Sequence, residues 1–290
     1  MGECVARSSH RSLRVTAIAV VTVLAAFAAS VGVARGASYV ALGVSYTAGP
    51  LIPNQVPPYG CLKSDRNFPH LAAPAIGLPL RDISCSGAET EDMTAPQEVE
   101  YDGPNPPQFS ALDAGTQVVT ITIGGNDIGF MEIAESCVTP NPFATPCQDK
   151  YNAGGTDTIA ERIAETAPKV RAVLRGIHQR SPDADVYVLN YAAIFPETGS
   201  GCWPQMPIGY ADVPYLRAKQ KQLNAMIAKQ ARATGTTLVD WYGASIGHDA
   251  CQGPLIRWVE PVVPVNPAAP VHPNLAGMEG AARALLASIG

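Results

Sequence analysis

Residues 39–49 read Tyr-Val-Ala-Leu-Gly-Val-Ser-Tyr-Thr-Ala-Gly, a short apolar run that stops at a turn of small residues carrying one hydroxyl. An apolar run followed by Gly-x-Ser predicts a β-strand with Ser45 at its carboxyl end. Open α/β sheets hold their ligands at this end of their strands. Most Gly/Ser turns are only turns, so the rest of the chain must support Ser45 as a nucleophile.

Four further strand patterns alternate with helical ones along the chain. Strands are expected at about 81–88, 118–123, 186–189 and 237–240. Helices are expected at about 68–76, 90–99, 156–177, 214–234 and 275–287, with a capping box of Thr158 and Glu161 at the third. This alternation predicts an α/β fold, a largely parallel sheet with helices on both faces. The β-branched segment 118–123 is expected at its buried centre.

The first 36 residues are typical of an export signal. Three arginines and a single acid lie within residues 1–14, and residues 15–33 carry no charge. The small residues at 32–34 suit a signal peptidase. We therefore expect a signal peptide at 1–36, a single domain at 37–290 and a secreted protein. An uncleaved anchor stays open, because the apolar run could just span a bilayer.

Six of the seven cysteines follow this leader. An even count in an exported chain predicts three disulfides, for which 15 pairings are possible. Residues 137 and 147 bracket a short proline-rich loop, which favours sequential pairing. The expected pairs are Cys61–Cys85, Cys137–Cys147 and Cys202–Cys251. The dispersed cysteines and the lack of C-x-x-C or H-E-x-x-H motifs give no reason to expect a metal site.

Composition excludes some partners. The chain of 290 residues is 47% hydrophobic and 16% charged, with a formal net charge of −5. This acidic balance, without a basic stripe interleaved with aromatic residues, argues against nucleic-acid binding. Residues 124–129 come near a dinucleotide fingerprint but lack its middle glycine, so no nucleotide cofactor is expected.

Chemistry-bearing residues gather at one predicted edge of the sheet. Ser45, Gly87 and Asn126 follow strands, and His272 comes just before the final helix. Alone, His272 could be a helix-entry histidine and Asn126 a turn residue. Together they supply a hydroxyl, a base and oxyanion donors: the backbone N–H groups of Ser45 and Gly87 and the amide of Asn126. This set predicts acyl transfer.

These residues lie in four blocks, at 43–49, 85–88, 124–127 and 271–274. In order and content the blocks resemble those of the GDSL or SGNH hydrolases, named for a Ser, Gly, Asn and His in separate blocks. The resemblance implies a flavodoxin-like three-layer sandwich and ester hydrolysis without a cofactor. The three-disulfide pattern is similar to that of secreted actinobacterial lipases and esterases. We expect a monomer acting on a small-molecule or lipid ester, with no stable membrane span after processing.

Two positions depart from the family pattern. Val44 stands where the family usually has Asp before the serine, and Ala269 stands where it commonly has Asp three residues before the histidine. Since some members resemble this chain in using a main-chain carbonyl to orient the histidine, we expect a Ser–His dyad with the carbonyl of Ala269 in that role. Asp249 or Glu260 could supply a carboxylate instead.

The leading interpretation is a secreted serine esterase or lipase. A carbohydrate esterase that removes acetyl groups uses the same chemistry. A lipid- or glycan-binding protein without catalysis is the alternative from another class, with Val44 and Ala269 as marks of lost activity. An α/β-hydrolase fits less well, because Thr47 occupies the second glycine position of the G-x-S-x-G elbow.

Overall fold

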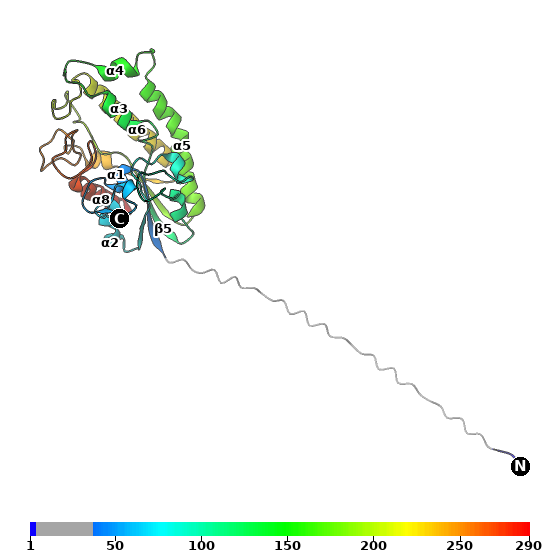
Figure 1. The fold of residues 1–290 in the computed structure, drawn as a ribbon. Coiled ribbons are helices and arrows are strands. Elements are labelled where there is room, and N and C mark those ends of the chain that lie inside the picture. Colours follow the sequence, from blue (N-terminus) through cyan, green and yellow to red (C-terminus); the bar gives the residue numbers. More distant parts are fainter. Residues whose placement is uncertain (4–36) are drawn as a thin grey trace. The chain divides into compact units, whose positions relative to one another are not determined.

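The computed structural model describes residues 1–3 and 37–290. The predicted signal peptide, residues 1–36, therefore lies outside the described residues except for its first three, and it stays a prediction. All helices and strands given below belong to residues 37–290 (Figure 1). Among the described residues, none of the helices is both long enough and apolar enough to span a bilayer.

The core of the fold is a five-stranded sheet in the order β4-β1-β5-β6-β7. Every neighbouring pair is parallel, which confirms the predicted parallel sheet. The chain leaves β1 toward β4 on one side and returns to β5 on the other, so the ends of β1 and β5 form the topological switch point where such sheets bind ligands. The strands are β1 (Ser38–Gly43), β4 (Leu80–Asp82), β5 (Thr116–Thr122), β6 (Asp185–Leu189) and β7 (Thr237–Val239).

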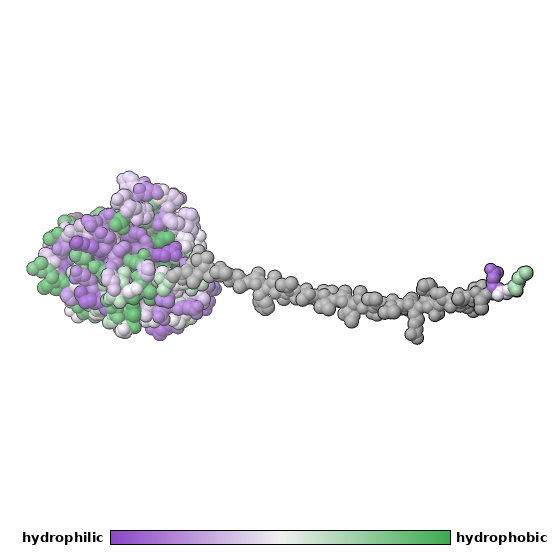
Figure 2. All heavy atoms as spheres, turned by 90° about the horizontal axis from the view of Figure 1, so that it is seen from below, coloured by the Kyte–Doolittle hydropathy of each residue, from purple (hydrophilic) through white to green (hydrophobic). Residues whose placement is uncertain are grey.

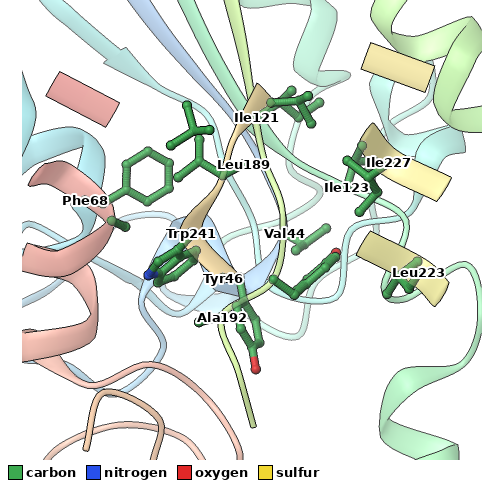
Figure 3. Packing of buried hydrophobic residues seen from close by; sticks show 14 of the residues in the cluster. Val44, Tyr46, Phe68, Ile121, Ile123, Leu189, Ala192, Leu223, Ile227 and Trp241 are labelled. Atoms are coloured by element: carbon green, nitrogen blue, oxygen red, sulfur yellow. The ribbon is translucent and has the colours of Figure 1, made fainter. Parts of the chain in front are cut away.

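Helices cover both faces of the sheet. Helices α2 and α8 pack together on one face, and α5 and α6 pack together on the other (Figure 1). In the core, Ile227 of α6 lies next to Ile123 at the end of β5, while Phe68 of α2 lies on the opposite side (Figure 3). The helices are α1 (Ser45–Ala48), α2 (Phe68–Ile76), α3 (Phe130–Ser136), α4 (Pro146–Tyr151), α5 (Thr158–Arg180), α6 (Asp212–Thr234), α7 (Trp241–Ala244) and α8 (Leu275–Ile289).

Strand β5 lies at the centre of the sheet, as its sequence predicts. It is paired with β1 on one side and β6 on the other. Val119 and Ile121 are fully buried.

Polar and apolar side chains are interspersed on the face seen in Figure 2, as on an ordinary folded domain.

Some local expectations were wrong. Helix α5 is capped by Asp157, whose carboxylate accepts the N–H of Ala160, and not by a box of Thr158 and Glu161. The helix expected at 90–99 is a single 3₁₀ turn, η2 (Thr90–Met93). Pro96 explains the short length, because a proline disfavours helical backbone at the residue before it.

The structure contains the three sequential disulfides. Cys61–Cys85 joins the loop that carries the small hairpin β2 (Gln55–Val56) and β3 (Lys63–Ser64) to the segment after β4. Cys137–Cys147 closes the loop between α3 and α4, and Cys202–Cys251 links the loop after β6 to the loop after α7. The disulfides thus link these loops covalently. Such links stabilise the fold mainly by lowering the conformational entropy of the unfolded chain.

The end of β1 depends on Gly43. Its φ is +130°, and a Cβ atom there would lie 2.7 Å from the carbonyl oxygen of Thr122 and 2.5 Å from Oγ1 of Thr47. The ends of β1 and β5 therefore approach so closely that no side chain fits between them.

This close approach can be tested by stability measurements. Gly43→Ala should lower the free energy of unfolding by about 3 kcal/mol or more, because it combines backbone strain with overpacking. Gly77→Ala is the matched control, since Gly77 also has a positive φ but nothing within 4 Å of its Cβ position. It should lose only about 1 kcal/mol. Equal losses in urea unfolding would contradict the steric argument.

Candidate active site

Ser45 stands at the first turn beyond β1. It begins α1, whose C-cap Gly49 has a φ of +76°. The turn is held by neutral groups. Gln108 binds both sides of Gly43, with Oε1 accepting the N–H of Gly43 at 2.7 Å and Nε2 donating to its carbonyl at 3.0 Å. The hydroxyls of Thr47 and Thr122 are hydrogen-bonded to each other, with 2.7 Å between their oxygen atoms. These bonds support the turn in which Val44, which is 2% exposed, packs into the apolar core (Figure 3).

His272 reaches Ser45 from the other end of the chain. Its Nε2 lies 2.8 Å from the hydroxyl oxygen of Ser45, and its Nδ1 lies 2.8 Å from the carbonyl oxygen of Pro270. A carbonyl only accepts hydrogen bonds, so Nδ1 carries the proton and Nε2 is left to accept the serine proton. Asn274 caps α8 as expected, accepting the N–H of Gly277 at 3.0 Å, and fixes the histidine loop to that helix.

The expectation that Ala269 orients the imidazole was wrong. The carbonyl of Ala269 accepts the backbone N–H of His272 at 3.2 Å, closing a tight turn. This turn brings the carbonyl of Pro270 beside Nδ1 instead. An aspartate three residues before the histidine can extend its side chain to Nδ1. A main-chain carbonyl has no side chain to extend, so its position depends on the conformation of the turn.

The two candidate carboxylates have other partners. Asp249 accepts hydrogen bonds from the N–H of Cys251 and from Nε2 of Gln252, both at 3.0 Å. Glu260 is fully buried and pairs with Arg257, and it also accepts from Nδ2 of Asn274 at 2.7 Å. Among the described residues, the imidazole of His272 bonds to Pro270 and Ser45 and to no carboxylate.

Three candidate donors follow the adjacent strands β1, β4 and β5. The backbone N–H groups of Ser45 and Gly87 have no hydrogen-bond acceptor within the described part of the chain. Nδ2 of Asn126 donates one hydrogen to the carbonyl of Ala88 at 2.8 Å, which leaves its second hydrogen for another acceptor. This bond ties the Asn126 loop to the segment that carries Gly87. That segment is in turn joined to β1, because the N–H of Cys85 donates to the carbonyl of Gly43 at 3.0 Å.

Sequence reasoning missed two tyrosines that support these loops. The hydroxyl of Tyr191 accepts the N–H of Gly125 at 2.8 Å, so this N–H is not free to cradle a phosphate. Tyr46 follows the serine and donates its hydroxyl to the carbonyl of Val271 at 2.9 Å. Two sequence signals could have identified them: Tyr46 directly follows Ser45, and Tyr191 follows the end of a strand.

Among residues 1–3 and 37–290, no group of three or more His, Cys, Asp or Glu side chains could hold a metal ion.

An apolar pocket lies next to these residues. Gly125 and Val271, the neighbours of Asn126 and His272, form part of its wall. Lys219, the one lining residue with a charge, pairs with Asp157. Aliphatic side chains make up much of the remaining wall: Ile128, Ile133, Ile159, Leu216, Leu223 and Val262.

Burial determines the protonation of the histidine. His272 is 6% exposed. Burial disfavours the charged imidazolium and lowers the pKa of His272, and the hydrogen bond to Pro270 opposes only part of this effect. The ring is therefore neutral, and able to accept a proton, at more acidic pH than an ordinary histidine.

This chain is similar to several known proteins. Residues 41–279 match the GDSL-like lipase/acylhydrolase family. Lipase 2 of Streptomyces coelicolor is 41% identical over 82% of this chain and 81% of its own length. Phospholipase A1 from Streptomyces albidoflavus has a similar structure, with a TM-score of 0.73 and 26% identity over 87% of this chain and 99% of that one. An extracellular lipase from Streptomyces rimosus has a TM-score of 0.67 and 27% identity over 88% and 100% of the two chains.

The protonation of His272 can be measured directly. We expect its pKa, followed by ¹⁵N NMR of the ring in the folded protein, to lie below the usual value of about 6.5. The same histidine in urea-unfolded protein should titrate at the usual value. A folded-state pKa at or above the unfolded one would contradict the buried, carbonyl-bound imidazole.

Proposed function

The chain belongs to the GDSL-like lipase/acylhydrolase family and is a lipase or esterase of that family, and we propose that it hydrolyses carboxylic esters through an acyl group carried on Ser45. The observation that carries the proposal is the 2.8 Å contact between the hydroxyl of Ser45 and Nε2 of His272, with Nδ1 held by a carbonyl. A hydroxyl beside an oriented neutral base is the arrangement that activates a serine nucleophile.

The reaction proceeds in two halves. Oγ of Ser45 attacks the ester carbonyl while His272 takes its proton, and the tetrahedral intermediate expels the alcohol, which receives that proton from His272. Water then attacks the acyl-serine with His272 again as base. Collapse of the second intermediate releases the carboxylic acid and returns the proton to Ser45.

The oxyanion is stabilised by three donors. We assign this role to the backbone N–H groups of Ser45 and Gly87 and the side-chain amide of Asn126. The assignment is supported by the two unpartnered N–H groups and by the spare amide hydrogen within the described residues. Donors fixed before the reaction need no reorganisation when charge develops on the carbonyl oxygen.

The base works as part of a dyad. The carbonyl of Pro270 fixes the tautomer and orientation of His272, which is the geometric half of a triad acid's role. It is neutral, so it stabilises the imidazolium less than a carboxylate would. Both candidate carboxylates, Asp249 and Glu260, are hydrogen-bonded elsewhere, which supports the dyad.

The apolar pocket favours an acyl chain as the group bound there. Its wall of isoleucine, leucine and valine side chains offers contact to hydrocarbon and almost no polar partners for a sugar. We therefore favour esters of medium or long acyl chains over acetylated carbohydrate. Secretion is part of this proposal, supported by the three disulfides and the charge-free run at residues 15–33.

The dyad is tested with acyl ester substrates. Ser45→Ala and His272→Ala should each lower kcat by on the order of 10⁴-fold or more, because nucleophile and base act as one unit. Asp249→Asn should keep kcat within about threefold, since that carboxylate does not touch the imidazole, whereas loss of a triad acid costs about 10⁴. A loss of that size in Asp249→Asn would make Asp249 a third member. Wild-type rates no faster than those of Ser45→Ala would refute the hydrolytic proposal.

The acyl pocket has its own test. Ala134 lines the pocket from α3, and Ala134→Leu should fill part of it. The ratio of kcat/KM for a decanoyl ester to that for an acetyl ester should fall about tenfold, the scale of a small steric change in an apolar site. Ala172→Leu places the same change on an exposed position of α5 and should leave the ratio unaltered. An unchanged ratio in Ala134→Leu would show that acyl chains bind elsewhere.

A further inference from the structure

Val271 has a backbone conformation that its side chain disfavours. Its φ is +60°, in the left-handed region. Four non-glycine residues of the described chain have such a φ, and Val271 alone among them is β-branched: Leu51, Leu62, Asp102 and Val271. A positive φ in a β-branched residue is an outlier that persists only where surrounding contacts enforce it.

This strained residue lies where binding and catalysis meet. Val271 directly precedes His272, and its side chain lines the apolar pocket. The left-handed residue makes the chain reverse so that the carbonyl of Pro270 can face Nδ1 of His272. A return of Val271 to a negative φ would rotate the peptide that follows it and carry the imidazole away from Ser45.

Tyr46 supplies the contact that opposes this return. Its hydroxyl donates to the carbonyl of Val271 at 2.9 Å, and no other described group donates to that oxygen. Tyr46 is 2% exposed. Burial raises its pKa, so the hydroxyl remains a protonated donor throughout the pH range of catalysis.

The ring of Tyr46 is also in contact with its surroundings. It packs edge-on against Tyr191 and Trp241, with centroid distances of 5.0 Å and 5.8 Å, and its neighbour Trp241 is labelled in Figure 3. It also contacts the imidazole of His272, at a centroid distance of 5.3 Å. Since Tyr46 directly follows Ser45, one side chain connects the nucleophile's helix to the backbone of the base.

We propose that Tyr46 is a positioning residue for the Ser–His dyad: its hydroxyl holds Val271 in the left-handed conformation and thereby places His272 against Ser45. The inference rests on the proposed function, because the dyad is where its effect appears. A glycine in place of Val271 would adopt this backbone freely but would remove a pocket wall. The chain keeps a valine there and uses the tyrosine hydroxyl to hold it.

The test is a double-mutant cycle of Tyr46→Phe and Val271→Gly, assayed with a short acyl ester so that the pocket wall contributes little. Tyr46→Phe keeps the ring and removes one oxygen atom. It should lower kcat by about 10- to 100-fold with KM within about twofold, as a misplaced catalytic group does. In the Val271→Gly background the same change should cost less than about threefold, because glycine needs no hydroxyl to hold a positive φ.

Tyr191→Phe is the matched control. It removes another buried tyrosine hydroxyl near the site, one bonded to Gly125 and not to Val271. Its effect on kcat should be the same in both backgrounds. The proposal is overturned if Tyr46→Phe keeps kcat within about twofold of wild type, or if it costs as much in the Val271→Gly background as it does beside the native valine.

A measurement without turnover separates this proposal from the esterase proposal. The Nδ1 proton of His272, observed by ¹H NMR, should exchange with solvent faster in Tyr46→Phe and be protected again in the double variant. If wild type hydrolyses no ester, the esterase proposal fails and this signal still decides the role of Tyr46. Should Tyr46→Phe alone fail to fold, folding of the double variant would support the proposal, and failure of both would overturn it.

Discussion

The close approach of Gly43 to Thr122 determines the position of Ser45. With a φ of +130° and no room for a Cβ atom, Gly43 lets β1 end against β5 and turn at once. Ser45 then begins a helix at the switch point of the sheet, where the chain crosses from one side of β1 to the other. Any widening between these two strand ends would move Ser45 away from a histidine that lies 227 residues later in the chain.

The turn that carries Ser45 and the imidazole of His272 are held by neutral hydrogen bonds. Gln108 binds both peptide groups of Gly43, a hydroxyl of Thr122 supports the turn, and a carbonyl of Pro270 orients His272. None of these groups titrates in the usual pH range. These bonds therefore persist when the protonation of His272 changes. Among the described residues the imidazole has no carboxylate partner, so the imidazolium of the proposed reaction would receive less stabilisation than in a triad.

Much of the fold could be predicted from sequence because it depends on local patterns. Apolar runs and helical spacing gave the parallel sheet, and small-residue turns at strand ends gave Ser45, Gly87 and Asn126. The roles of Gln108 and Tyr46 could not be predicted, since their partners lie 65 and 225 residues away in sequence. The family resemblance pointed to the carbonyl of Ala269, whereas the structure uses that of Pro270. The position of a main-chain carbonyl depends on the turn, and the left-handed residue of this turn is a valine, which no propensity predicts there.

Val271 shows how pocket and base constrain each other. In the proposed function, the acyl pocket needs an apolar side chain at its wall, and the base needs a sharp turn just before His272. One residue serves both needs, and a left-handed valine costs about 1–3 kcal/mol. Glu260 helps to hold this turn, because its backbone N–H donates to the carbonyl of His272 at 2.9 Å while its buried carboxylate binds Asn274 and Arg257. Two hydrogen bonds thus oppose relaxation of the strained turn. Tyr46 binds the carbonyl of Val271, and the N–H of Glu260 binds the carbonyl of His272.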